Sequence, residues 1–202
     1  MSEFGKERLR SIAGFIAGLL TLRVFISYGM IRESGVAFES AFGGGASGVT
    51  GGIPELLWVV TSAYYVAGAF PVWIARLKNQ GRFDSFEAWT ASFQSASGII
   101  TVAFVAWHLI CFVYAAGEVQ EGGLVGWAAA YLQSSPLIPA VYAIGIIALA
   151  FHVANGGLRF AIGWGLATGE KAMGYATIVA SVLFGWMALT GFETIAVFLR
   201  GA

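Results

Sequence analysis

Apolar residues gather in five long runs, separated by shorter segments that hold most of the charged residues. The runs cover residues 12–31, 53–75, 97–116, 137–158 and 173–199. About 20 consecutive apolar residues cross the hydrocarbon core of a bilayer as a helix. No segment shows the regular apolar and polar alternation of barrel strands. The pattern therefore predicts an all-α bundle of five membrane-spanning helices, in a single domain over residues 1–202.

The composition agrees with a protein that lies in a membrane. The chain is 58% hydrophobic and 11% charged, whereas soluble domains carry about 25% charged residues. No connecting segment is long enough to hold a core of its own. The formal net charge of zero gives no indication of a nucleic-acid partner. Cys111 is the single cysteine, which excludes an internal disulfide.

Positive charges predict the orientation. They precede the first run and lie between the second and third and between the fourth and fifth: Lys6, Arg8, Arg10, Arg76, Lys78, Arg82, Arg159 and Lys171. The other side has Arg32 and Arg200, and its segment 117–136 has neither Lys nor Arg. The positive-inside rule then places the N-terminus in the cytoplasm and the C-terminus outside.

Several shorter features carry local predictions. Residues 34–52 are rich in glycine and predict a flexible outer loop. Aromatic residues at helical spacing over 83–94 predict a short interfacial helix before the third span. Pro71 predicts a kink or an end of the second span. Gly14 and Gly18 are spaced for close helix packing in the first span.

The two histidines, His108 and His152, lie inside the third and fourth runs. A histidine in hydrocarbon should face the protein interior, so the pair indicates a cofactor site or the remains of one. The orientation puts His108 in the outer half and His152 in the inner half. They are then about seven residues apart in depth, or roughly 10 Å, which is poorly suited to one shared iron.

Three motifs accompany these histidines. They are L-R-S-x-x-G at 9–14, S-G-I-I followed by W-H-L at 97–109, and F-H-x-x-N-G at 151–156. With five spans and an inside N-terminus, they resemble the five-helix cytochrome b membrane-anchor subunit of succinate dehydrogenase and fumarate reductase. The resemblance covers the whole chain, and the F-H-x-x-N-G motif is its most specific part.

The resemblance implies a subunit of respiratory complex II, in electron transport and the tricarboxylic acid cycle. Such a subunit is a multi-pass protein of a prokaryotic cell membrane and is non-catalytic alone. It would anchor a flavoprotein with FAD and an iron–sulfur subunit on the cytoplasmic face. It would bind menaquinone or ubiquinone, and its complexes often form dimers or trimers.

The resemblance also raises the question of whether the chain binds haem. Its dihaem members hold two b haems with four histidines, one on each of the first four helices. His108 and His152 match the third and fourth positions, whereas Phe25 and Tyr64 stand at the first and second. Phenylalanine cannot bind iron, and a buried tyrosine resists the loss of its proton. We therefore expect an anchor without haem, with a single haem on His152 as the alternative.

Two other functions are open at this stage. One is a cytochrome that contains haem b and carries electrons across the membrane; iron content separates it from the anchor without haem. The other is a small transporter, which the odd number of spans and the lack of an inverted repeat disfavour.

Polar residues near the cytoplasmic ends of the spans are candidates for quinone binding. The electrons would arrive from the iron–sulfur subunit on the cytoplasmic face, and without a haem to carry them outward they would stay on that face. They are Arg10 and Ser11 at the first span, Ser97 at the third and Asn155 in the fourth. The serines have a structural alternative as helix caps. Glu193, an acid at membrane depth near the outer end of the fifth span, is a weaker candidate for an outer quinone site.

Overall fold

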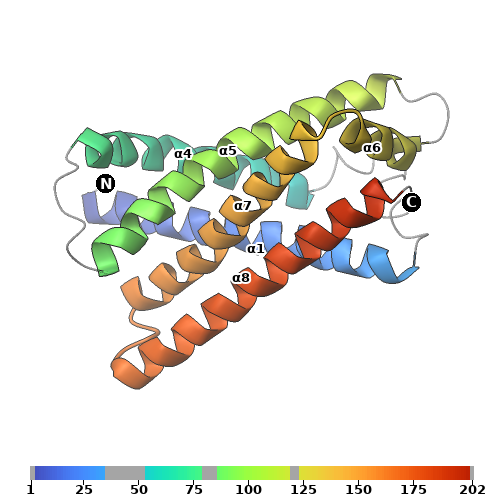
Figure 1. Cartoon of the computed structure of the whole chain (residues 1–202). Helices are drawn as coiled ribbons and strands as arrows, with labels where there is room; N and C mark the ends of the chain where they lie inside the picture. The colour runs from blue at the N-terminus through green and yellow to red at the C-terminus, as the bar shows by residue number, and fades with distance from the viewer. Residues whose placement is uncertain (1–2, 35–52, 79–85, 119–122, 201–202) are drawn as a thin grey trace.

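The structure, a computed structural model, describes residues 3–34, 53–78, 86–118 and 123–200 (Figure 1). These ranges are α-helical apart from the turns at 134–136 and 164–169 and the last residue, Arg200. The helices are α1 (Glu3–Ser34), α4 (Ile53–Lys78), α5 (Phe86–Glu118), α6 (Gly123–Gln133), α7 (Leu137–Gly163) and α8 (Glu170–Leu199). The all-α prediction is confirmed, and each predicted apolar run lies within one of the five long helices.

The long helices run back and forth along one axis (Figure 1). Successive long helices point in opposite directions, so the two termini lie at opposite ends. α7 is central, because it packs against α1, α5, α6 and α8. α4 packs mainly on α1. A polar group on α7 can therefore be contacted from several sides.

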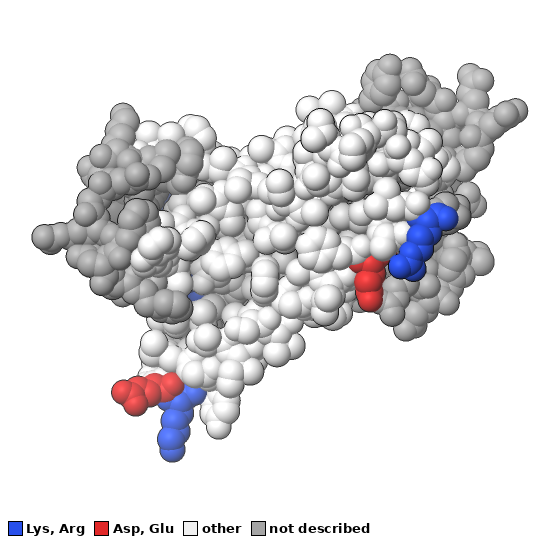
Figure 2. Space-filling model, in the orientation of Figure 1, with Lys and Arg blue, Asp and Glu red and all other residues white. Residues whose placement is uncertain are grey.

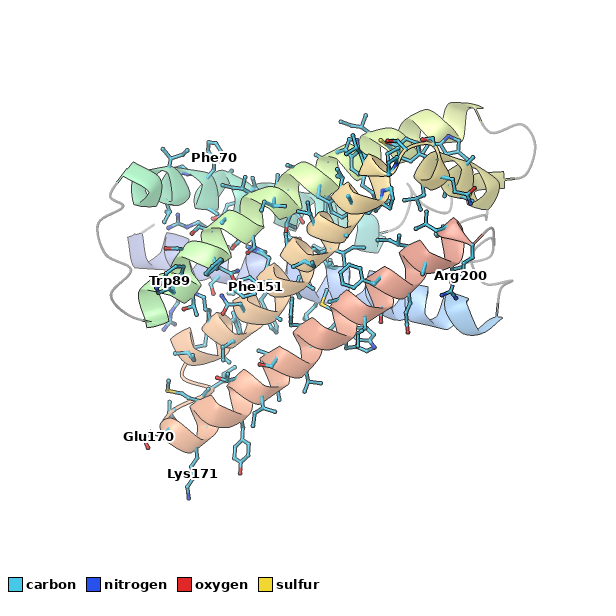
Figure 3. All side chains as sticks on the ribbon, viewed as in Figure 1. Phe70, Trp89, Phe151, Glu170, Lys171 and Arg200 are labelled. Carbon is cyan, nitrogen blue, oxygen red and sulfur yellow. The ribbon has the colours of Figure 1, made fainter. Side chains whose placement is uncertain are left out.

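Two helices, α7 and α8, are long and apolar enough to cross a membrane. Residues 172–192 of α8 carry no charge, and these 21 residues rise by roughly 31 Å, close to the hydrocarbon thickness of about 30 Å. Figure 3 places Glu170 and Lys171 at one end of α8 and Arg200 at the other. Between these ends, the described part of the face seen in Figure 2 is almost entirely white, and its charged side chains gather towards the two ends. That α1, α4 and α5 also cross a membrane stays a prediction.

The distribution of large and small side chains is that of helices packed in an apolar medium. Many exposed side chains on α8 are large and apolar, such as Tyr175 at 71% and Val182 at 67% exposed. Most buried apolar residues are alanines, and the core around Ala150 and Met187 joins α7 to α8. Small residues let membrane helices approach closely, while lipid covers the large ones.

Glycines set the closest helix contacts. A Cβ atom on Gly14 would lie 2.7 Å from the ring of Tyr65, so the predicted close packing at Gly14 is confirmed. A Cβ atom on Gly18 would meet Val153 at an ordinary 3.9 Å. Gly145 of α7 lies directly under the ring of Phe104 of α5. Aromatic rings can therefore sit against the backbone of a neighbouring helix.

Local features of the structure differ in part from the predictions. The part of 83–94 that the structure describes is no separate interfacial helix, because α5 runs unbroken from Phe86 to Glu118 without a proline or an early glycine. Pro71 lies inside α4, which continues to Lys78, so it does not end the helix, and the predicted kink stays a prediction. The short helix α6 was not predicted, because 11 residues are too short to span a bilayer; it packs on α8 and α7. The predicted loop at 34–52 lies outside the described residues apart from Ser34, which ends α1.

Candidate functional site

Four polar side chains join α5 to α7 inside the bundle. The amide of Asn155 donates to Oε1 of Gln94 at 2.7 Å, and Nε2 of Gln94 donates to the backbone carbonyl of His152 at 3.1 Å. The hydroxyl of Ser97 donates to the backbone carbonyl of Gln94 at 3.2 Å, and Nδ1 of His152 lies 3.1 Å from the same carbonyl. Ser97 and Asn155 are buried. This network is the most extensive polar feature of the described interior.

The hydrogen-bond contacts of the His152 ring are made by Nδ1. Nδ1 also lies 3.2 Å from Nε2 of Gln94 and 3.4 Å from the hydroxyl of Ser97. The hydroxyl of Ser97 already donates to a carbonyl oxygen, whereas the amide of Gln94 has a second N–H. Nδ1 can therefore donate to the Gln94 carbonyl or accept from the Gln94 amide, depending on the tautomer. Metal-ligating histidines donate from the ring nitrogen that does not bind the metal, so the neighbours of Nε2 decide what His152 can do.

Tyr65 of α4 is the neighbour that completes this site. Its ring lies edge-on to His152, with the ring centroids 5.9 Å apart, and its hydroxyl is hydrogen-bonded with the side chain of Gln94. Gly14 of α1 leaves room for the other side of the ring. Tyr64, which the resemblance put at the ligand position, is 40% exposed. The ring beside His152 is thus that of the next residue along α4.

Arg10 and Ser11 lie at the start of α1, each with a partner on a different helix. The guanidinium of Arg10 donates to the backbone carbonyl of Gly68 on α4 at 3.1 Å. The hydroxyl of Ser11 accepts from Nε1 of Trp164 at 3.1 Å. The guanidinium of Arg8 lies 5.1 Å over the ring of Trp164, a cation–π arrangement. The two residues are held in place, yet Ser11 keeps its own proton for another acceptor.

His108 lies in a separate aromatic group towards the other end of the bundle. Its Nδ1 pairs with the hydroxyl of Tyr142 at 2.9 Å, and its ring stacks on Phe104. His152 touches α5 at Gly98, ten residues before His108. The depth between the histidines is therefore roughly 15 Å. It exceeds the expected 10 Å, because the expectation was counted from approximate span ends.

The structure joins some of the predicted quinone-binding residues and separates others. Ser97 and Asn155 belong to one network through Gln94. Arg10 and Ser11 are neighbours on α1 but lie outside that network. The polar groups thus form two groups at the same end of the bundle, one internal and one at the start of α1.

The remaining predicted residues do not join these groups. Glu193 is exposed on α8, roughly 35 Å along the helix from Glu170. It belongs to the opposite end of the bundle. The side chain of Phe25 lies outside the described residues.

Gln94 and Tyr65 are the site residues that sequence reasoning missed. Gln94 shares a face of α5 with Ser97 and Thr101, at spacings of three and four residues, which is the signal that could have found it. Thr101 is buried, and its hydroxyl has no hydrogen-bond partner in the described part of the chain. The network therefore ends at Ser97. The sequence did not single out Tyr65, because its neighbour Tyr64 is the same residue type and the pattern could not distinguish the two.

Comparison with curated proteins finds a relative along the whole chain. No family model matches the chain, and no solved structure matches it. A full-length match among curated proteins shows that the chain is a homologue of a membrane-anchor subunit. The relative is the succinate dehydrogenase cytochrome b558 subunit of Bacillus subtilis (strain 168), which is 27% identical over 206 residues. The match covers 98% of each chain.

A cytochrome carries haem, so the relative's name raises the question of whether haem fits this chain. Across from His152, α4 presents the ring of Tyr65 where a second histidine would be needed. That ring lies against Gly14 of α1. The described residues beside His152 therefore offer no second histidine for a haem held by two histidines.

Proposed function

We propose that the chain is the membrane-anchor, quinone-binding subunit of a succinate:quinone oxidoreductase, and that it works without haem. The observation that carries the proposal is the match along 98% of both chains. The two long apolar helices support membrane anchoring. A flavoprotein and an iron–sulfur subunit would dock at the cytoplasmic end, and the iron–sulfur subunit would supply the electrons.

The chain's own part in the reaction is to hold the quinone and to donate hydrogen bonds. Reduction of a quinone takes two electrons and two protons, and it needs a donor at each carbonyl oxygen. Arg10 uses one guanidinium N–H for Gly68 and has others for a carbonyl oxygen. Ser11 accepts from Trp164 and can donate its own proton. We assign the quinone carbonyl contacts to Arg10 and Ser11.

The internal network has a supporting role in this proposal. Ser97 is buried, and its hydroxyl already donates a hydrogen bond to the Gln94 carbonyl. Asn155 is buried and bound to the Gln94 side chain. These residues fix α5 against α7 next to the quinone site, so they position it and do not touch the quinone.

We expect Arg10→Leu to lower kcat/KM for the quinone by about tenfold or more, because a charge-assisted hydrogen bond is lost. The measurement is succinate-dependent reduction of a short-chain quinone by the purified complex. Arg200→Leu is the matched control, since Arg200 is an exposed arginine at the other end of the bundle. Equal activity of Arg10→Leu and wild type would refute the assignment of Arg10.

The proposal also predicts the spectrum of the complex. We expect no b-type bands in a reduced-minus-oxidised spectrum and no pyridine haemochrome, because Tyr65 stands opposite His152. The relative's name favours a second candidate, a haem b cytochrome that carries electrons across the membrane. One haem per complex, lost on His152→Ala, would establish that candidate.

A further inference from the structure

We propose that Trp164 is a positioning residue of the quinone site, which fixes the hydroxyl of Ser11 so that its proton points to a quinone carbonyl oxygen. The inference rests on the proposed function and deepens it, because it explains how one donor of that site is held in place. The two residues come from different helices, since Ser11 lies in α1 and Trp164 directly follows α7.

The backbone at the end of α7 holds Trp164 in one place. The N–H of the next residue, Gly165, donates to the carbonyl of Ile162 at 3.1 Å. The N–H of Leu166 donates to the carbonyl of Ala161 at 2.8 Å. Gly165 has a φ of +70°, which glycine adopts without strain. These are the two hydrogen bonds of a Schellman motif, so the position of Trp164 relative to α7 is fixed.

The indole ring of Trp164 is also held by its neighbours. It stacks on Phe160 of α7, with the ring centroids 5.4 Å apart and the planes 24° apart. Phe160 stacks in turn on Phe15 of α1, with the centroids 4.2 Å apart. The guanidinium of Arg8 lies over the indole at cation–π distance. Aromatic and cation–π contacts thus hold the ring where α7 meets α1.

This placement decides the direction of the Ser11 proton. The indole N–H is a donor only, and it donates to the hydroxyl oxygen of Ser11 at 3.1 Å. The proton of Ser11 must then point away from the indole, and the described residues give it no acceptor. The hydroxyl of Ser97, by contrast, already donates to the Gln94 carbonyl. An accepted hydrogen bond also polarises the hydroxyl and strengthens the bond that it donates.

Trp164 therefore acts on the reaction through Ser11, and no bond forms or breaks at the indole. Negative charge grows on the carbonyl oxygens of the quinone as electrons arrive from the iron–sulfur subunit. A donor that is fixed beforehand stabilises this charge more than it stabilises the neutral quinone. Loss of the indole N–H should therefore lower kcat more than it raises KM.

Trp164→Phe tests this role, because it removes the N–H and keeps an aromatic ring for Phe160 and Arg8. We expect kcat for succinate-dependent reduction of a short-chain quinone to fall about fivefold, with KM changed by less than about twofold. Trp186→Phe on α8 is the matched control, since Trp186 is 38% exposed and Trp164 36%. It should leave kcat unchanged. An unchanged kcat in Trp164→Phe would overturn the inference.

A double variant separates positioning from direct contact with the quinone. Ser11→Ala combined with Trp164→Phe should be no slower than Ser11→Ala alone, because Trp164 acts through that hydroxyl. Ser11→Thr keeps a hydroxyl, so Trp164→Phe should still lower kcat in that variant. Losses that multiply in the Ser11→Ala double variant would show that Trp164 acts independently of Ser11, and they would overturn the positioning role.

A second assay keeps this inference separate from the proposed function. Electron transfer from succinate to a water-soluble dye bypasses the quinone site, and it should be equal in the wild-type and Trp164→Phe complexes. An equal loss in both assays would mean that the substitution damages the whole complex, against a positioning role. Dye reduction without quinone reduction by the wild-type complex would overturn the proposed function. Full quinone reductase activity of Ser11→Ala would refute the Ser11 contact and the inference with it.

Discussion

Gln94→Leu should destabilise the complex by about 3 kcal/mol, equivalent to a fall in the thermal midpoint of roughly 10 °C. Leucine has a similar size, so the change removes hydrogen bonds and leaves the volume nearly unchanged. The buried amide of Asn155 loses its acceptor, and the carbonyl of His152 loses its donor. Tyr65 loses its hydrogen bond as well. The measurement is thermal unfolding of the detergent-solubilised complex.

Two further variants show whether the loss comes from the network. Gln133→Leu removes an exposed glutamine that donates to the carbonyl of Phe198 on α8. It should cost well under 1 kcal/mol, since exposed hydrogen bonds compete with water. Asn155→Leu combined with Gln94→Leu should destabilise the complex by less than the sum of the two single changes, because the double variant removes the donor and the acceptor of one hydrogen bond together. A small effect of Gln94→Leu would mean that the network does not hold α5 to α7.

The positions of the long helices follow from the sequence, whereas their mutual rotation does not. Apolar runs predict helices directly, since each run must bury or shield its backbone groups in a helix. The rotation of each helix depends on which of its side chains packs against a glycine of the neighbouring helix. The resemblance pointed to Tyr64 in the second span, but the ring that faces Gly14 is that of Tyr65. One residue turns the side chain by about 100°, enough to move it from the interior to the surface.

The candidate site was predictable where polar residues stand out against an apolar background. Ser97, His152 and Asn155 were identified in this way, and the structure joins them. Gln94 was missed because it lay in the segment expected to be a separate interfacial helix. In the structure α5 begins at Phe86, so Gln94 belongs to the same helix face as Ser97.

The two histidines make packing and hydrogen-bond contacts within the bundle. Nδ1 of His152 lies at the Gln94 carbonyl, and the ring lies beside Tyr65 and Gly98. His108 is bonded to Tyr142. Each histidine thus makes side-chain contacts between α5 and α7. In this chain we interpret both as packing and hydrogen-bonding residues of the bundle.

Gly145→Ala should be the most damaging change of a single methyl group. In a helix, alanine is favoured over glycine by about 1 kcal/mol, so an unhindered site would be stabilised. At Gly145 the new Cβ would overlap the ring of Phe104. That ring also packs edge-on against Tyr142 and stacks with His108, so it cannot move aside freely. We expect a net loss of about 3 kcal/mol, as in overpacked cores.

Gly157→Ala on the same helix is the matched control, because no atom lies within 4 Å of the Cβ it would add. It should leave the thermal midpoint unchanged or raise it slightly. Phe104→Leu should recover part of the stability lost in Gly145→Ala, since leucine is smaller and more flexible. If Gly145→Ala and Gly157→Ala behave alike, Phe104 does not pack against Gly145.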